Sequence, residues 1–116
     1  MSYQQADPGC LHVQTLAQRN SKSSIMDIAI DPDSEALPAG DLAAVVESAA
    51  QAIKQARKNQ ASVMLAYGAH LVKNGIAPIL IRLMEQGWIT HLATQGAGTI
   101  HDWEFSYWGR SEEDVR

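Results

Sequence analysis

The sequence is short of three things: it has one cysteine, no long apolar run and no excess of basic charge. A single thiol, Cys10, cannot form an intrachain disulfide, which favours a reducing compartment. No apolar run approaches the roughly 20 residues that cross a bilayer, and the chain does not open with a basic segment followed by an apolar one. We therefore expect a cytoplasmic protein with no membrane partner.

Basic charge is scarce because nine Lys and Arg residues stand against thirteen Asp and Glu residues, for a formal net charge of −4. The basic side chains are also dispersed, so neither sign nor pattern favours a nucleic-acid partner. Metal-ligand spacings such as Cys-x-x-Cys and His-Glu-x-x-His are missing. So is the Gly-x-Ser-x-Gly turn of serine hydrolases. We expect no metal site and find no marked nucleophile.

A chain of 116 residues is long enough for one domain, and its composition changes near residue 40. Residues 1 to about 24 are polar and rich in Gln and Ser, and a short apolar segment follows at residues 25–30. Residues 1–40 together predict an extended N-terminal arm. Asp41 then stands where a helix N-cap or first-turn acid is favoured. The helix that follows opens residues 41–116, which we interpret as the folded module. Its apolar face comprises Leu42, Val45, Val46, Ala49, Ala50, Ile53 and Ala56.

Two apolar runs separated by a helical pattern indicate a β-α-β unit. The first, residues 63–67, has no polar alternation, which is typical of a strand buried on both faces of a parallel sheet. Gly68 ends this run, a helix with Pro78 in its first turn follows, and Gly87 ends that helix. The second run, residues 88–94, leads through a glycine-rich turn into another helix. The predicted fold class is α/β, a Rossmann-like parallel sheet fragment with a β-α-β unit and flanking helices.

The two glycine-rich turns predict where a ligand binds. Parallel strands joined by a right-handed crossover place their carboxyl ends at one edge of the sheet, and ligands bind at that edge. Glycine lets the backbone approach a ligand closely, and a helix N-terminus attracts anions. The chemistry should lie within residues 68–75 and 94–104, at a nucleotide or phosphate site. The candidate cofactor-binding residues are Gly68, His70, Asn74, Gly75, Thr94, Gln95, Gly96, Gly98, His101 and Asp102.

Catalytic residues are harder to name from the pattern. His101 with Asp102 is the best acid or base candidate, because imidazole titrates near neutrality and a carboxylate can set its tautomer. As neighbours on a helix, however, they point in different directions, so we do not expect them to pair directly. Lys73 is the one lysine near the predicted edge, and we interpret it as a solvated lysine at the start of a helix.

The last segment of the sequence is aromatic. Ile100, Trp103, Tyr107 and Trp108 recur at helical spacing and predict a face that packs on the sheet or on another chain. The polar run from Ser111 is typical of the capped start of a further helix, so we expect an incomplete domain. Two strands cannot cover both edges of a sheet, and an uncovered edge near aromatic residues predicts at least a homodimer.

Residues 65–102 run from a strand ending LAYGAH, through KNG into a helix, to a strand ending ATQGAGTIHD. This stretch resembles the early NAD-binding part of deoxyhypusine synthase, where Leu-Gly-Tyr-Thr-Ser-Asn and Ser-Ser-Gly precede Thr-Thr-Ala-Gly-Gly-Val-Glu-Glu-Asp. His70 replaces the family's Asn, Lys73-Asn74 replaces Ser-Ser, and Ile100-His101 replaces the Glu-Glu pair. The matching positions are Leu65, Tyr67, Leu71, Gly75, Ile76, Leu83, Leu92, Thr94, Gly98 and Asp102.

The resemblance implies NAD as cofactor and, for the family, oxidation of spermidine and transfer of its aminobutyl group to a protein lysine. The family's carboxylate pair helps to hold cofactor and polyamine, so Ile100-His101 indicates another amine or a different substrate. The family's catalytic lysine lies far downstream, and no lysine follows Asp102 here, so we expect no catalysis by this chain alone. The alternative is a non-enzymatic α/β structural module that assembles with copies of itself.

Overall fold

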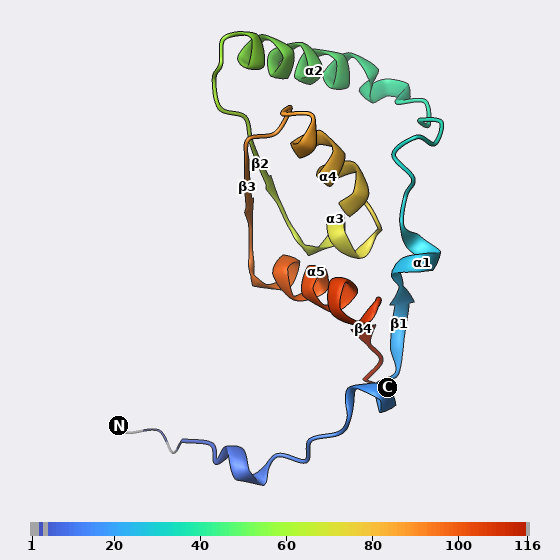
Figure 1. The fold of residues 1–116 in the computed structure, drawn as a ribbon, viewed down its shortest axis with the longest axis vertical. Coiled ribbons are helices and arrows are strands. Elements are labelled where there is room, and N and C mark those ends of the chain that lie inside the picture. The colour runs from blue at the N-terminus through green and yellow to red at the C-terminus, as the bar shows by residue number, and fades with distance from the viewer. Residues whose placement is uncertain (1–2, 4, 116) are drawn as a thin grey trace.

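The structure, a computed structural model, describes residues 3 and 5–115 and is a mixed α/β arrangement with two small sheets (Figure 1). Short 3-10 helices are labelled η. In chain order the elements are η1 Pro8–Cys10, η2 Leu16–Gln18, β1 Ser21–Ser24, α1 Ile25–Ile28, η3 Gly40–Leu42, α2 Ala43–Lys58, β2 Met64–Tyr67, α3 Ala69–Lys73, α4 Ala77–Glu85, β3 His91–Thr94, α5 Gly96–Trp108 and β4 Arg110–Glu113. Within the described residues, no helix combines the length and apolarity needed to cross a bilayer.

The predicted β-α-β unit is confirmed. Strands β2 and β3 pair in parallel, with Met64 opposite His91 and Tyr67 opposite Thr94, and α3 and α4 form the connection between them. Pro78 lies in the first turn of α4, where its missing N–H leaves no helical hydrogen bond unmade. Gly87 follows α4 with a φ of 73°, a left-handed conformation that suits glycine.

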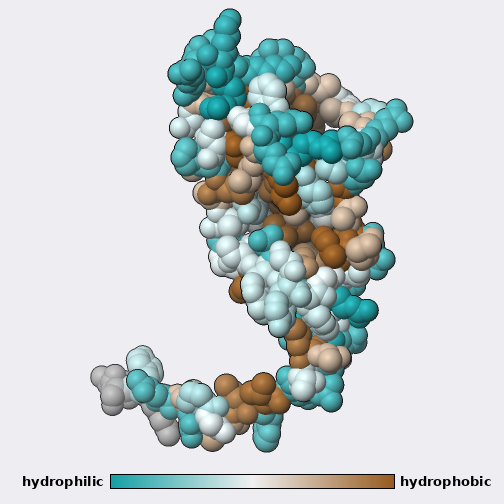
Figure 2. Space-filling view, in the orientation of Figure 1, coloured by the Kyte–Doolittle hydropathy of each residue, from teal (hydrophilic) through white to brown (hydrophobic). Residues whose placement is uncertain are grey.

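The prediction that these strands are buried on both faces is wrong. Met64 and Leu92 are exposed, because each borders an open hollow rather than a packed neighbour: Met64 the one under α2, and Leu92 the one between α4 and α5. Helix α2 forms as the pattern predicts, but it stands off the sheet. An open apolar hollow of about 440 Å³ separates the two and includes Ile53 of α2 and Trp88 among its lining residues. Apolar residues consequently reach the surface over the middle of the molecule (Figure 2).

The N-terminal arm is more ordered than its composition predicts. Strand β1 pairs antiparallel with β4, with Ser21 opposite Glu113 and Ser24 opposite Arg110. The extended segment predicted at residues 25–30 begins instead as the helical turn α1, and the helix predicted from Ser111 is instead part of β4. Gly109, with a φ of 73°, ends α5 and turns the chain into this strand, where its carbonyl accepts a hydrogen bond from the Ile25 amide at 2.9 Å.

The arm also packs against the end of α3. Gly75 has a φ of 80°, and a β-carbon on it would lie 1.9 Å from the Ile28 carbonyl oxygen. The Ile30 amide donates to the Gly75 carbonyl at 2.9 Å, so the two backbones touch without an intervening side chain. Among the described residues, the buried apolar side chains are few: Val72, Leu80, Ile89 and Phe105. Ile25 of the arm lies beside two of them, Val72 of α3 and Phe105 of α5.

Candidate functional site

The carboxyl ends of β2 and β3 meet at an open hollow. The strands run side by side and end next to the first turns of α3 and α5 (Figure 1). The hollow is shallow and widely open to solvent, with a volume of about 510 Å³. Two predicted turns therefore come together at one edge, as their positions in the sequence indicate. The lining residues are Ala66, Tyr67, Gly68, Ala93, Thr94 and Gln95.

Glycine leaves the backbone accessible at two points beside this hollow. A β-carbon built on Gly68 or on Gly96 would meet no atom within 4 Å. Both residues adopt conformations open to any amino acid, since neither has a positive φ. Positive φ therefore does not explain glycine at these positions, and the open space beside the backbone is what a bound ligand would use.

Two of the predicted site residues, Thr94 and Gly98, make contacts that stabilise the fold. The Thr94 hydroxyl donates a hydrogen bond to the Tyr67 carbonyl at 2.9 Å, which ties the ends of the two strands together. A β-carbon on Gly98 would lie 2.2 Å from Thr94 Oγ1, so glycine here permits α5 to pack on β3. The sequence pattern predicts Gly98 as a point of ligand approach, whereas the structure buries it inside the protein.

The start of α5 has a side-chain cap. Gln95 Oε1 accepts a hydrogen bond from the Ala97 amide at 2.7 Å, satisfying one of the free N–H groups at the helix N-terminus. Thr99 Oγ1 donates to the Gly96 carbonyl at 2.8 Å one turn later. An anion bound at this end of α5 would compete with the Gln95 amide oxygen for the same N–H group.

The remaining predicted residues lie in separate places rather than at the hollow. His70 is exposed on the first turn of α3. Asn74 and Gly75 lie at the opposite end of α3, and Gly75 is covered by Ile28 rather than open to a ligand. Asp102 borders a different hollow between α4 and α5. Of the ten predicted residues, three thus line the hollow, namely Gly68, Thr94 and Gln95, and Gly96 follows directly after them; the other six lie away from the lining.

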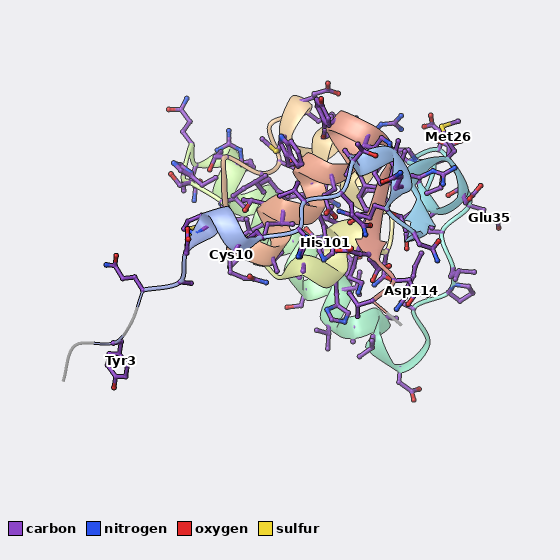
Figure 3. The ribbon with its side chains drawn as sticks, turned by 90° about the horizontal axis from the view of Figure 1, so that it is seen from below. Tyr3, Cys10, Met26, Glu35, His101 and Asp114 are labelled. Carbon is purple, nitrogen blue, oxygen red and sulfur yellow. The ribbon has the colours of Figure 1, made fainter. Side chains whose placement is uncertain are left out.

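His101 belongs to a buried polar cluster that the sequence does not reveal. Ser111 is fully buried, and its Oγ donates to Glu104 Oε2 at 2.5 Å and lies 2.6 Å from His101 Nδ1. Because the hydroxyl proton is given to Glu104, His101 Nδ1 is the donor to Ser111 Oγ, and Nε2 is the free nitrogen. Figure 3 shows His101 near the centre of the molecule, far from the end of the arm at Tyr3.

Arg19 connects this cluster to the N-terminal arm. Arg19 Nη1 contacts Glu104 Oε1 at 2.5 Å, and the guanidinium lies 5.6 Å from the centre of the Trp108 ring. The hydrogen bond from Arg19 lowers the pKa of the Glu104 carboxyl, and a further hydrogen bond from Ser111 adds to this effect. A buried serine cannot reach a substrate, so we assign this cluster to holding β1, β4 and α5 together.

Lys73 is also held, contrary to our interpretation of a solvated lysine. Its Nζ forms an ion pair with Glu112, whose carboxylate also accepts from the Ser23 hydroxyl at 2.5 Å. These contacts lower the pKa of Glu112, the bond from Lys73 more than the one from Ser23. Only the His101–Glu104 spacing of three along α5 signals any of this in the sequence, because Arg19 and Ser23 lie more than 80 positions from their partners.

Metal binding has no support in the described part of the chain, where no group of three or more His, Cys, Asp or Glu residues is arranged to hold an ion. Comparisons with protein families, with curated proteins and with solved structures found no match to this chain.

Proposed function

We propose that the hollow at the ends of β2 and β3 binds NAD or a related nucleotide, in a module similar to the early part of deoxyhypusine synthase. One observation carries the proposal: two parallel strands end side by side in an open hollow, and glycine backbone leads each of them into a helix. Open α/β sheets bind nucleotides at this edge. The resemblance of residues 65–102 to the family's NAD-binding stretch supports the same ligand.

The surrounding groups suit a phosphate-bearing ligand. Helix α5 is 13 residues long, so its N-terminus carries the partial positive charge that attracts an anion. Gly68 and Gly96 offer backbone that no neighbouring side chain covers. Tyr67 is among the residues that line the hollow, and it also borders the hollow between α4 and α5. Gln95 would release the Ala97 amide to the ligand.

The substrate is a separate matter from the cofactor. Ile100-His101 stands where the family has two carboxylates, so a polyamine lacks the acidic partners that would hold its charges. His101 faces Ser111 and Glu104 rather than the hollow. We therefore propose a nucleotide-binding module that does not transfer an aminobutyl group by itself, with a different amine as the substrate class of any larger assembly.

A calorimetric titration with NAD tests the proposal. Gly68→Val adds a side chain at the hollow, and its β-carbon would meet no protein atom within 4 Å, so it should abolish the heat of binding while the far-ultraviolet circular dichroism stays unchanged. Lys58→Ala, at the far end of α2, is the matched control and should bind NAD as the wild type does. Gly98→Val is unsuitable here because its side chain would collide with Thr94 inside the fold.

Two results would remove the proposal. One is the absence of any heat with wild-type protein at millimolar NAD. The other is equal affinity in the wild type and in Gly68→Val, which would place the ligand elsewhere. The first result would leave the alternative, a non-enzymatic module that assembles with copies of itself. The exposed aromatic residues of α5 support that alternative.

A further inference from the structure

Helix α5 presents an apolar stripe to solvent on the side opposite the core. Ile100, Trp103 and Tyr107 are 57%, 58% and 70% exposed, whereas Gly98 and Phe105 on the other side are buried. The rings of Trp103 and Tyr107 stack on each other, with centroids 5.1 Å apart and planes 6° from parallel. Spacings of three and four are those of a coiled-coil seam, so these three side chains form one continuous ridge, the α5 seam.

The charge around the α5 seam permits contact with an identical surface. Thr99 and Ser106 flank it on one side and carry no charge. Glu104 lies on the other side, but its carboxylate is already engaged by Arg19 and Ser111. Two copies can therefore bring their seams together without burying an unpaired Glu104 carboxylate. Asp102, the charged group on the same side as Ser106, is exposed beyond Ser106 and belongs to the rim of the interface.

The chain exposes more surface than a compact monomer of its mass. The described chain exposes 9347 Å², whereas a compact monomer of 12.6 kDa exposes about 6,200 Å². Its radius of gyration of 19.0 Å likewise exceeds the roughly 13 Å of a compact domain of this length. The extended segment before β1 (Figure 1) contributes to both excesses, so the area of the interface itself has to be taken from the seam and its neighbours, against the roughly 800 Å² that each partner buries in a stable dimer.

The apolar surface continues beyond α5. The hollow between α4 and α5 is bordered by Ser106 and includes Ile81, Met84 and Leu92, all of them exposed. The three seam side chains alone expose roughly 400 Å² if each offers the area typical of its type. The exposed side chains of Ile81, Met84 and Leu92 beside the hollow add apolar area next to the seam, with Asp102 at its rim.

We propose that a second copy of this chain is the partner, joined through the α5 seam about a two-fold axis. An antiparallel pair of α5 helices centred on Trp103 brings the two Trp103 rings together and sets each Tyr107 near Ile100 of the partner subunit. The same patch serves both copies, as two-fold symmetry requires. This dimer is independent of nucleotide binding, because the seam does not line the hollow at the strand ends.

Sedimentation velocity over a range of about 5 to 500 µM tests the proposal, since mass action populates a dimer as concentration rises. The weight-average mass of the wild type should rise toward twice the monomer mass. Trp103→Ser combined with Tyr107→Ser should keep it at the monomer value. The control is Tyr3→Ser with Leu37→Ser, which removes residues 92% and 91% exposed outside the seam and should leave association unchanged.

A cross-link locates the axis without disturbing the fold. In a Cys10→Ser background, Trp103→Cys should form a disulfide-linked dimer in a glutathione redox buffer several times faster than Leu37→Cys does. A wild type that stays monomeric at all concentrations would overturn the proposal. So would a double variant that dimerises as the wild type does, which would point to another face such as the hollow under α2. The NAD titration should be unchanged in the Trp103→Ser, Tyr107→Ser variant. The test of the dimer is therefore independent of the test of nucleotide binding.

Discussion

Replacing Gly75 by alanine should loosen the N-terminal arm from the folded body. The residue has a φ of 80°, which costs an alanine about 1 kcal/mol. Its new β-carbon would lie 1.9 Å from the Ile28 carbonyl oxygen, so the backbone of the arm must move away. The hydrogen bond from the Ile30 amide to the Gly75 carbonyl then breaks, at a further cost of about 1 kcal/mol. Because this movement also exposes some apolar surface of the arm, we expect a total of about 2–4 kcal/mol.

Gly87 supplies a matched control, because it shares the left-handed conformation and lacks the neighbour. Its φ is 73°, and a β-carbon there would meet no atom within 4 Å. Gly87→Ala should therefore cost only about 1 kcal/mol, and the gain from a stiffer unfolded chain applies equally to both variants. The difference between them measures the packing of the arm on Gly75 alone.

Thermal unfolding followed by circular dichroism compares the two variants. Gly75→Ala should melt roughly 5–15 °C below Gly87→Ala, as 1–3 kcal/mol implies for a domain of this size. Hydrogen exchange should show the Ile30 amide losing protection in Gly75→Ala and keeping it in Gly87→Ala. Equal melting temperatures, with Ile30 equally protected in both, would refute the close packing of the arm on α3.

Two further predictions concern charged groups. Because the folded-state pKa of Glu104 is lowered, chiefly by Arg19, its stabilisation is complete above the ordinary carboxyl pKa near 4.5 and is lost as pH falls through the lowered value. Denaturant titrations below that pH should thus show a shallower fall of stability in Glu104→Gln than in the wild type, and an unchanged slope would contradict this. Incubation with NAD and radiolabelled spermidine should yield neither NADH nor labelled protein, since Lys73 is engaged by Glu112. Turnover that Lys73→Ala abolishes would instead make Lys73 catalytic.

Local patterns were enough to predict the parallel pair, helix α4 and helix α5, whereas the short helix α3 forms where a glycine turn was predicted. An unbroken apolar run ending at Gly68, a helix with Pro78 in its first turn and a second run before a glycine-rich turn determine a β-α-β unit from neighbouring residues alone. Strand β1 could not be predicted in this way. Its sequence, SKSS, has no strand signal, and its partner β4 lies at the other end of the chain. The prediction that both faces of β2 and β3 are buried was wrong for a related reason. An apolar run in the sequence does not show whether another element packs over the strand.

The sequence predicted where the candidate site lies but not which side chains line it. Strand ends fix where Gly68 and Thr94 lie, and these two do meet at the hollow. The direction in which a helical residue points depends on packing, so the turn of His101 toward Ser111 was not visible in the sequence. Glycine at position 98 has the same ambiguity, because tight helix packing and close ligand approach both require a missing side chain.

The pairing of β1 with β4 has a consequence for the order in which the chain folds. Joining Ser21 to Glu113 closes a loop of about 90 residues, whereas joining β2 to β3 closes one of about 27, so the first closure costs roughly 1 kcal/mol more in chain entropy. We therefore expect the parallel pair with α4 to form early and the two ends of the chain to meet last. During synthesis the arm emerges first yet remains without its partner strand until β4 has been made, and until then the surface that it covers near Gly75 stays open to solvent.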